Sequence, residues 1–260
     1  MKKLLLLFIC LCLLAGCQGK PQGNDKPDDP APPVDDPYVN DNGDDGDDDA
    51  PDPVNYSVTI WSVEQEVASA TGTAAEKVEL TEALVSFSRI PFNLDDLLSV
   101  DRDDDEWGKF YAVALLICAY KTWTPNDEDT CMEMMKALMN SPSSPDTYTN
   151  YTKSFVKERM LQNDKGDYIA DCYFYGATPA NGYVWEEPPG VMMREYPYAP
   201  ELSTINGVEL YVEKIVVEFE GADTERTVSV YQDPTDHNWY IFSDTYGHLL
   251  VDVMEPERYK

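Results

Sequence analysis

Apolar side chains surround one predicted helix on every side. Between Trp107 and Tyr120 they recur three and four positions apart, and most of the intervening positions are apolar as well. A helix with no polar face lies at the centre of a fold. Its uninterrupted apolar stretch, Phe110 to Tyr120, is too short to cross a membrane.

Two further helices are predicted after this one. Thr124-Pro125 followed by Asp127 is typical of a helix start, and the helix should run to about Met139. Ser144-Pro145-Asp146 repeats the pattern before a helix to about Leu161. We interpret the methionines of the first of these helices as flexible core filler rather than a soft-metal or peptide-binding surface; they are Met132, Met134, Met135 and Met139.

The segment before the central helix is less regular. Ser57 to Trp61 is predicted as a first strand, and the loose pattern from Ala74 to Phe87 is interpreted as a helix. Ile90-Pro91 should end this element, and a short helical turn should follow to Leu98.

From Tyr168 the pattern changes to that of strands and turns. Strand-like runs cover 168–175 and 183–185, and 191–198 is predicted as an edge strand. Four strands joined by short loops should then form an antiparallel meander: 208–219, 226–231, 239–242 and 249–253. Helices followed by strands predict an α+β fold, with N-terminal helices packed on a C-terminal antiparallel β-meander in a single domain.

The first residues have the layout of an export signal. Met1-Lys2-Lys3 is basic, Leu4 to Leu14 is apolar, and Leu14-Ala15-Gly16-Cys17 closes the segment with small residues before a cysteine. This sequence resembles the bacterial lipoprotein signal. The resemblance implies removal of residues 1–16 and lipid attachment to Cys17, which would hold the protein at the extracytoplasmic face of the cell membrane.

Residues 17–53 are predicted to be a disordered tether. Between residues 18 and 53 there are eight prolines and twelve aspartates and almost no large apolar side chain. Asp41 to Asp47 has the alternating carboxylates of a calcium loop, but its third position is a glycine and prolines follow it, so loose counterion binding is favoured. The folded domain should therefore span 54–260.

Charge narrows the choice of partners. The chain has 49 acidic and 19 basic residues, a formal net charge of −30, which excludes direct nucleic-acid binding. Residues 54–260 alone carry 37 acids against 15 bases. Cationic partners, calcium, or neutral glycans and peptides remain open.

Nothing in the sequence predicts a cofactor or a structural metal. Three cysteines stay in the domain, Cys118, Cys131 and Cys172; an odd number gives no closed disulfide set, and at least one should be a buried thiol. His237 and His248 bracket one predicted strand and should lie at opposite ends of the sheet. The chain has no recognised catalytic motif, so an enzyme is disfavoured, although a carboxylate pair is possible.

Two local clusters are candidate sites. Asp101 to Glu106 alternates carboxylates but lacks the glycine and distal glutamate of a calcium loop, and we interpret it as favouring the start of the central helix. Asn181, Tyr183 and Trp185 crowd one proline-bounded loop, where they are predicted to bind a neutral glycan or peptide. The alternative is a turn whose aromatic rings cover the sheet edge.

The domain also resembles an uncharacterised family. The resemblance covers about 87–256 and rests on Ile90-Pro91, Ala112 to Tyr120, Tyr173 to Tyr183, Gly221-Ala222-Asp223 with Arg226, and Trp239 with Leu249 to Val253 and Pro256. The family is a domain of unknown function of secreted proteins and lipoproteins in Firmicutes-type bacteria, and it implies no activity. The sequence thus predicts an anchored ligand-binding or surface-assembly domain, with a small hydrolase and a structural spacer as the alternatives.

Overall fold

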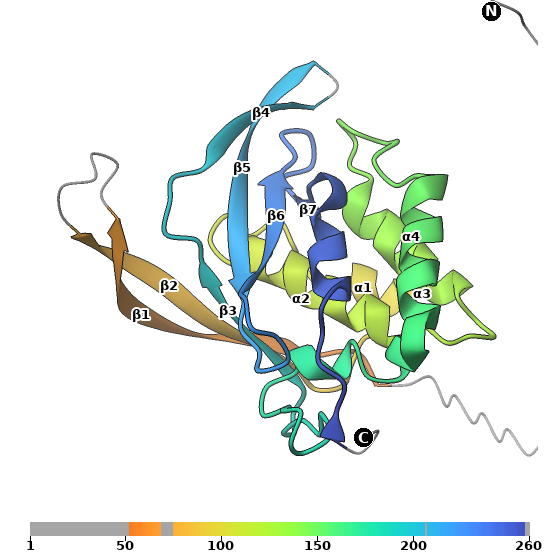
Figure 1. The fold of residues 1–260 in the computed structure, drawn as a ribbon. Helices are drawn as coiled ribbons and strands as arrows, with labels where there is room; N and C mark the ends of the chain where they lie inside the picture. The colour runs from red at the N-terminus through yellow and green to blue at the C-terminus, as the bar shows by residue number, and fades with distance from the viewer. Residues whose placement is uncertain (1–51, 69–74, 206, 258–260) are drawn as a thin grey trace, which may run out of the picture. The chain divides into compact units, whose positions relative to one another are not determined.

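A computed structural model describes residues 52–68, 75–205 and 207–257. The described residues form one compact unit, and the predicted α+β class is confirmed (Figure 1). The helices are α1 (Leu94–Leu98), α2 (Gly108–Lys121), α3 (Asp129–Met139) and α4 (Asn150–Leu161). The strands are β1 (Tyr56–Ala68), β2 (Ala75–Phe87), β3 (Gly190–Glu195), β4 (Glu201–Ile205), β5 (Val208–Val217), β6 (Arg226–Gln232) and β7 (Trp239–Ile241).

The strands form one antiparallel sheet in the order β1-β2-β3-β5-β6-β7, with β4 paired to β5. Three short 3-10 segments complete the described chain: Gln162–Asp167, Asp171–Tyr173 and Ser243–Leu250. Within these residues, none of the helices has the length and apolar character needed to cross a membrane.

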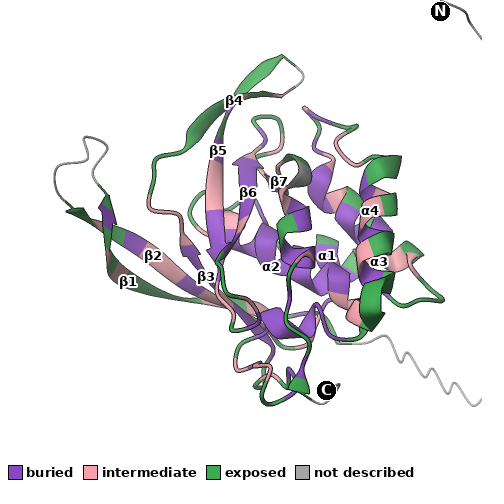
Figure 2. Ribbon diagram, viewed as in Figure 1, coloured by how far each residue is buried: buried purple, intermediate pink, exposed green. Residues whose placement is uncertain are grey.

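The central helix is confirmed as α2. Every side chain from Phe110 to Tyr120 is buried, because α2 contacts strands of the sheet on one side and α3 on the other (Figure 2). The Tyr120 hydroxyl donates to the Tyr246 carbonyl oxygen at 3.0 Å, which satisfies its one polar atom. Asp104 Oδ1 accepts from the amides of Glu106 and Trp107 in the turn just before α2, whereas α2 itself has no side-chain cap and no acid in its first turn.

The core also accounts for the sulfur-containing residues. All four methionines of α3 are buried, which confirms their interpretation as core filler. Cys118, Cys131 and Cys172 are buried free thiols. Burial raises the pKa of each of these thiols, so they are protected from ionisation.

Several predicted elements are wrong in type or position. Residues 75–87 form a strand and not a helix, because Ala83, Val85 and Phe87 alternate into the core while the backbone pairs with β1 and β3. The predicted edge strand at 191–198 is β3, an interior strand between β2 and β5. Residues 249–253 form no strand: Leu249 and Leu250 are consecutive and both fully buried, which fits a helical turn and not a strand.

The helix starts and one strand-like run also differ from the prediction. Thr124 bonds with Asp127 in a turn, and α3 begins only at Asp129. Thr149, not Ser144, caps α4, in a reciprocal pair with Thr152. The run 168–175 forms 3-10 turns with a single bridge from Phe174 to Val191, and 183–185 is loop.

A buried carboxylate ties the loop after α3 to the β6–β7 turn. Asp233 is fully buried and accepts from Ser143 N at 2.9 Å, Ser143 Oγ at 2.9 Å and Thr235 N at 2.8 Å. Although desolvation acts to raise the pKa of Asp233, these and neighbouring hydrogen bonds together lower it below the ordinary value.

We expect Asp233→Asn to destabilise the domain by about 1.5–3 kcal/mol at pH 7, the usual value of hydrogen bonds to a charged group. Because the folded pKa lies below the unfolded one, this stabilisation is present above the unfolded pKa of about 3.8 and is lost as pH falls through the folded pKa. Urea unfolding of both chains at pH 7 and at low pH should show the two free energies converging in acid. A constant difference would contradict this account.

Candidate functional site

The loop that the sequence singled out is held together by one amide side chain. Asn181 Oδ1 accepts from the amides of Thr178 and Val184, at 2.9 and 3.1 Å. Its Nδ2 donates to the carbonyl oxygens of Gly176 and Val184, both at 2.9 Å. Asn181 thus uses its polar atoms on its own loop, and its role in this structure is to fix the loop's shape.

The two aromatic residues of that loop face the interior. Tyr183 is buried; its ring stacks on Tyr168, and its hydroxyl donates to the Met254 carbonyl oxygen at 2.7 Å. Trp185 is half-buried against Phe174, with Lys121 Nζ 5.0 Å from its ring centroid. Asn181, Tyr183 and Trp185 therefore form no common exposed surface, and the structure places them as the support of a loop.

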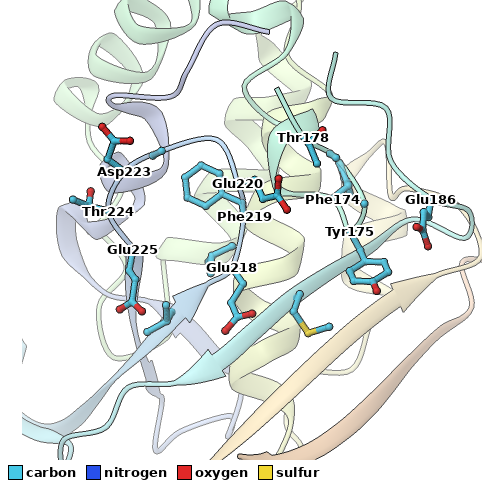
Figure 3. A pocket seen from close by; sticks show the side chains of 16 residues that line it. Phe174, Tyr175, Thr178, Glu186, Glu218, Phe219, Glu220, Asp223, Thr224 and Glu225 are labelled. Atoms are coloured by element: carbon cyan, nitrogen blue, oxygen red, sulfur yellow. The ribbon is translucent and has the colours of Figure 1, made fainter. Parts of the chain in front are cut away.

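This loop forms one wall of a groove of about 610 Å³ (Figure 3). Phe174, Tyr175, Thr178 and Glu186 lie on this side. The end of β5 and the loop that follows it, residues 216–225, supply the other wall, and Met192 contributes from β3. The groove therefore joins two segments that are about 40 residues apart in the chain.

Two glycines set the close approach of the groove's backbone. Gly176 has φ +83°, and a Cβ there would lie 2.6 Å from Glu186 Cγ. A Cβ on Gly221 would come within 2.9 Å of the Phe219 ring and 3.0 Å of the Tyr183 hydroxyl. The buried Tyr183 thus lies directly behind the second wall.

Carboxylates dominate the polar lining. Five acids contribute, namely Glu186, Glu218, Glu220, Asp223 and Glu225, and none of the described residues that line the groove is basic. The neighbouring cation is Arg194 of β3, which pairs with Glu225 and lies 3.3 Å from Glu218 through Nε. Among the described residues, Glu186, Glu220 and Asp223 form no ion pair. Within the part of the chain that the structure describes, the negative charge of these three acids is not neutralised by an ion pair.

Glu218 is the groove acid with a clear shift. Burial raises its pKa above the ordinary value, and the nearby Glu82 and Glu225 raise it further, while Arg194 acts in the opposite direction. Its negative charge is consequently lost at a higher pH than that of an ordinary glutamate. Acids with raised pKa values in a hollow are typical of functional sites, although ion-pair networks also produce them.

A second hollow, of about 370 Å³, is neutral. It lies between α4 and the β4–β5 hairpin, and it is lined by threonine and serine hydroxyls and by aromatic rings, including those of Tyr151, Phe242 and Tyr246. The Tyr151 side chain is 70% exposed and its ring lies 6.2 Å from that of Phe155. This aromatic surface is absent from the sequence-based candidates, because its members come from α4, from β6 and from the 3-10 segment after β7.

The structure also locates most of the remaining sequence candidates. Across the described residues, no three His, Cys, Asp or Glu side chains are placed to share a metal ion. His237 lies in the β6–β7 turn. His248 lies in the segment after β7, and its Nδ1 is 3.0 Å from the carbonyl oxygen of Thr227. Asp101 and Asp104 accept from backbone amides of their own segment. Cys17 and Asp41 to Asp47 lie outside the described residues.

Comparison with known proteins gives one match. A family model described as domain of unknown function (DUF6935) matches residues 89–257. The curated proteins contain no match, and neither do the solved structures. All residues that line the acidic groove lie within the matched range, whereas β1 and β2 precede it.

Proposed function

The chain belongs to the DUF6935 family, and we propose that it is a lipid-anchored extracytoplasmic protein that binds cationic peptides in the acidic groove. The family description names no activity, so the proposal rests on this chain's own residues. The anchor is inferred from sequence: a basic start, an apolar run and Leu14-Ala15-Gly16 precede Cys17, and two or three acyl chains on that residue hold a protein stably in a membrane.

The observation that carries the binding proposal is the pairing of free carboxylates with aromatic walls. Glu186 and Glu220 come from opposite walls of the groove with Tyr175 between them, and Phe219 lies beside Glu220 on the second wall (Figure 3). A Lys or Arg side chain has both an apolar stem and a cationic head, so it can pack on the rings and place its charge among the carboxylates.

Several alternatives fit this geometry less well. A bare divalent ion needs several ligands at one point, and the described residues hold no such group. An anionic ligand would meet five carboxylates. A hydrolase needs a nucleophile or a polarised acid pair aimed at one atom, and a spacer needs no groove at all.

We expect the purified mature chain, in neutral detergent, to bind a fluorescein-labelled tetralysine peptide and not to bind a tetraglutamate peptide with the same label. Glu186→Gln combined with Glu220→Gln should weaken tetralysine binding about threefold to tenfold at low salt, because each exposed charge pair contributes about 0.2–1 kcal/mol. Fluorescence anisotropy measures both peptides.

The matched control removes the same charge elsewhere. Glu133 on α3 and Glu158 on α4 are exposed and lie outside the groove. Glu133→Gln combined with Glu158→Gln should change the affinity less than about twofold. Equal weakening by both pairs would mean non-specific attraction to an acidic protein, and no binding by the unmodified chain would remove the proposal and favour a spacer.

A neutral glycan is the second candidate ligand, and the neutral hollow favours it. Tyr151 presents an exposed ring beside threonine hydroxyls, which is the combination that stacks and hydrogen-bonds a sugar. A glycan array probed with the unmodified chain and with Tyr151→Ala separates this site from the acidic groove. A glycan that binds the unmodified chain and does not bind the Tyr151→Ala variant would be assigned to this hollow.

A further inference from the structure

The sheet ends in a long strand with one free side. In the part of the chain that the structure describes, β1 pairs only with β2, over all 13 of its residues. Figure 1 shows this hairpin extending beyond the helices, and Figure 2 shows β1 exposed along most of its length. Strand order places β1 at the edge, so half of its backbone hydrogen-bonding groups point away from the protein.

The register identifies which groups point outward. The amide of Ser88 donates to the carbonyl oxygen of Asn55, so Asn55 and every second residue after it face β2. The backbone groups of Val58, Ile60 and Ser62 therefore face outward, together with those of Tyr56 at one end and Glu64 and Glu66 at the other.

The first eight residues of β1 contain none of the charged residues or prolines that protect a sheet edge. The strand contains no proline, lysine or arginine, the residues that commonly prevent edge-to-edge pairing. Residues 56–63 are uncharged, although the domain as a whole is strongly acidic. Ile60 is 37% exposed on one face of the sheet and Trp61 is 41% exposed on the other.

The positions of the acids limit the registers in which two copies of the chain could pair through β1. Two copies of an acidic domain repel each other, so a contact between them must keep the acids apart. In an antiparallel pair centred on Ile60, Glu64 lies opposite Tyr56 and Glu66 opposite Val54, so no carboxylate faces another. A pair centred on Glu64 would place two glutamates in direct opposition.

We propose that two copies of the chain pair through β1, antiparallel and centred on Ile60, to form a symmetric dimer with a continuous sheet. Ile60 then lies opposite Ile60 of the second copy, and Trp61 lies opposite Thr59, which are favourable cross-strand pairs on the two faces. The outward groups of both strands are satisfied, and the contact is closed by its twofold axis. This assembly uses residues outside the matched family domain and is independent of the acidic groove.

The register can be tested in cells by cysteine cross-linking of the full chain. On the twofold axis, Ile60→Cys places two thiols in directly opposed positions, within reach of a disulfide. Glu64→Cys places them eight residues apart along the paired strands, roughly 26 Å, which is too far. We expect mild oxidation to give a dimer on a non-reducing gel for Ile60→Cys and none for Glu64→Cys. Equal cross-linking of both variants, or of neither, would overturn this register.

The energetics can be tested by sedimentation equilibrium of the mature chain in neutral detergent. Ile60→Lys places two like charges in opposition, so the dimer dissociation constant should rise at least about tenfold. Leu202 on β4 is also an exposed apolar residue on a strand, and Leu202→Lys should change the constant less than about twofold.

Three results would overturn the dimer proposal: an unmodified chain that stays monomeric, a dimer that Ile60→Lys leaves intact, and a dimer that Leu202→Lys dissociates instead. Tetralysine binding in the groove should be unchanged in both lysine variants, which shows that they are folded. If Ile60→Lys abolished tetralysine binding to a monomeric chain, the edge would be a peptide site and the second copy would be the wrong occupant.

Discussion

Leu116→Ala is expected to destabilise the domain by about 3–4 kcal/mol, a large fraction of the stability of a typical domain. Leu116 lies in the middle of α2, and none of its side chain is exposed. Since α2 is surrounded by the sheet and α3, the cavity left by the lost methyl groups can collapse only by moving rigid elements. Urea unfolding followed by circular dichroism measures the free energy.

The matched control is a leucine on the neighbouring helix α1. Leu98 is 56% exposed, so Leu98→Ala removes little buried area and should cost less than about 1 kcal/mol. A loss of under 1 kcal/mol for Leu116→Ala as well would mean that α2 does not lie at the centre of the core.

The success and failure of the sequence-based fold follow from how each element is buried. The helix α2 was predictable because burial on all sides removes polar residues from every position, a pattern that no surface element shares. The strand β2 was missed because its exposed half carries Glu76, Lys77 and Glu79 at positions that also fit a helix. Only pairing with β1 and β3, a long-range feature, decides its structure.

The choice of helix caps also depends on structure that the local sequence does not show. Thr124, Ser144 and Thr149 can all accept from a following amide, and sequence alone does not rank them. The structure uses Thr149 because its hydroxyl accepts from the Thr152 amide while Thr152 Oγ1 accepts from the Thr149 amide, and Ser144 is occupied in the turn with Ser141 and Thr147. Thr124 and Ser144 were chosen from their local sequence, whereas the actual cap depends on the path of the loop.

None of the three predicted site residues, Asn181, Tyr183 and Trp185, lines the acidic groove, although all three belong to the loop that forms one of its walls. The loop around Asn181 was identified from its turn residues and aromatic rings, and it does form a wall of the groove. The roles of Tyr183 and Trp185 were not predictable, because an aromatic ring in a loop can point either way and only packing against Tyr168 and Phe174 decides it. The acidic wall after β5 was missed, since glutamates in a chain this acidic carry no signal until the fold places them beside the loop.

Cys17→Ala is expected to abolish membrane anchoring altogether, because the proposed thioether to lipid is the sole stable anchor that the sequence suggests. The variant should accumulate with residues 1–16 uncleaved or be released in soluble form. Incorporation of labelled palmitate and fractionation of membranes from the soluble phase measure the effect, and globomycin, which blocks lipoprotein signal cleavage, should prevent maturation of the unmodified chain.

Two further cysteines provide the matched control for the anchor. Cys10 and Cys12 lie in the apolar part of the same segment and are removed with it if cleavage occurs before Cys17. Cys10→Ala and Cys12→Ala should therefore leave palmitate labelling and membrane fractionation unchanged. The anchor would lie elsewhere if the Cys17→Ala variant still incorporated palmitate. The same conclusion would follow if globomycin did not affect processing of the unmodified chain. In that case the groove and the β1 edge would act without a tether, and their binding tests would still stand, since neither site includes a residue before Val54.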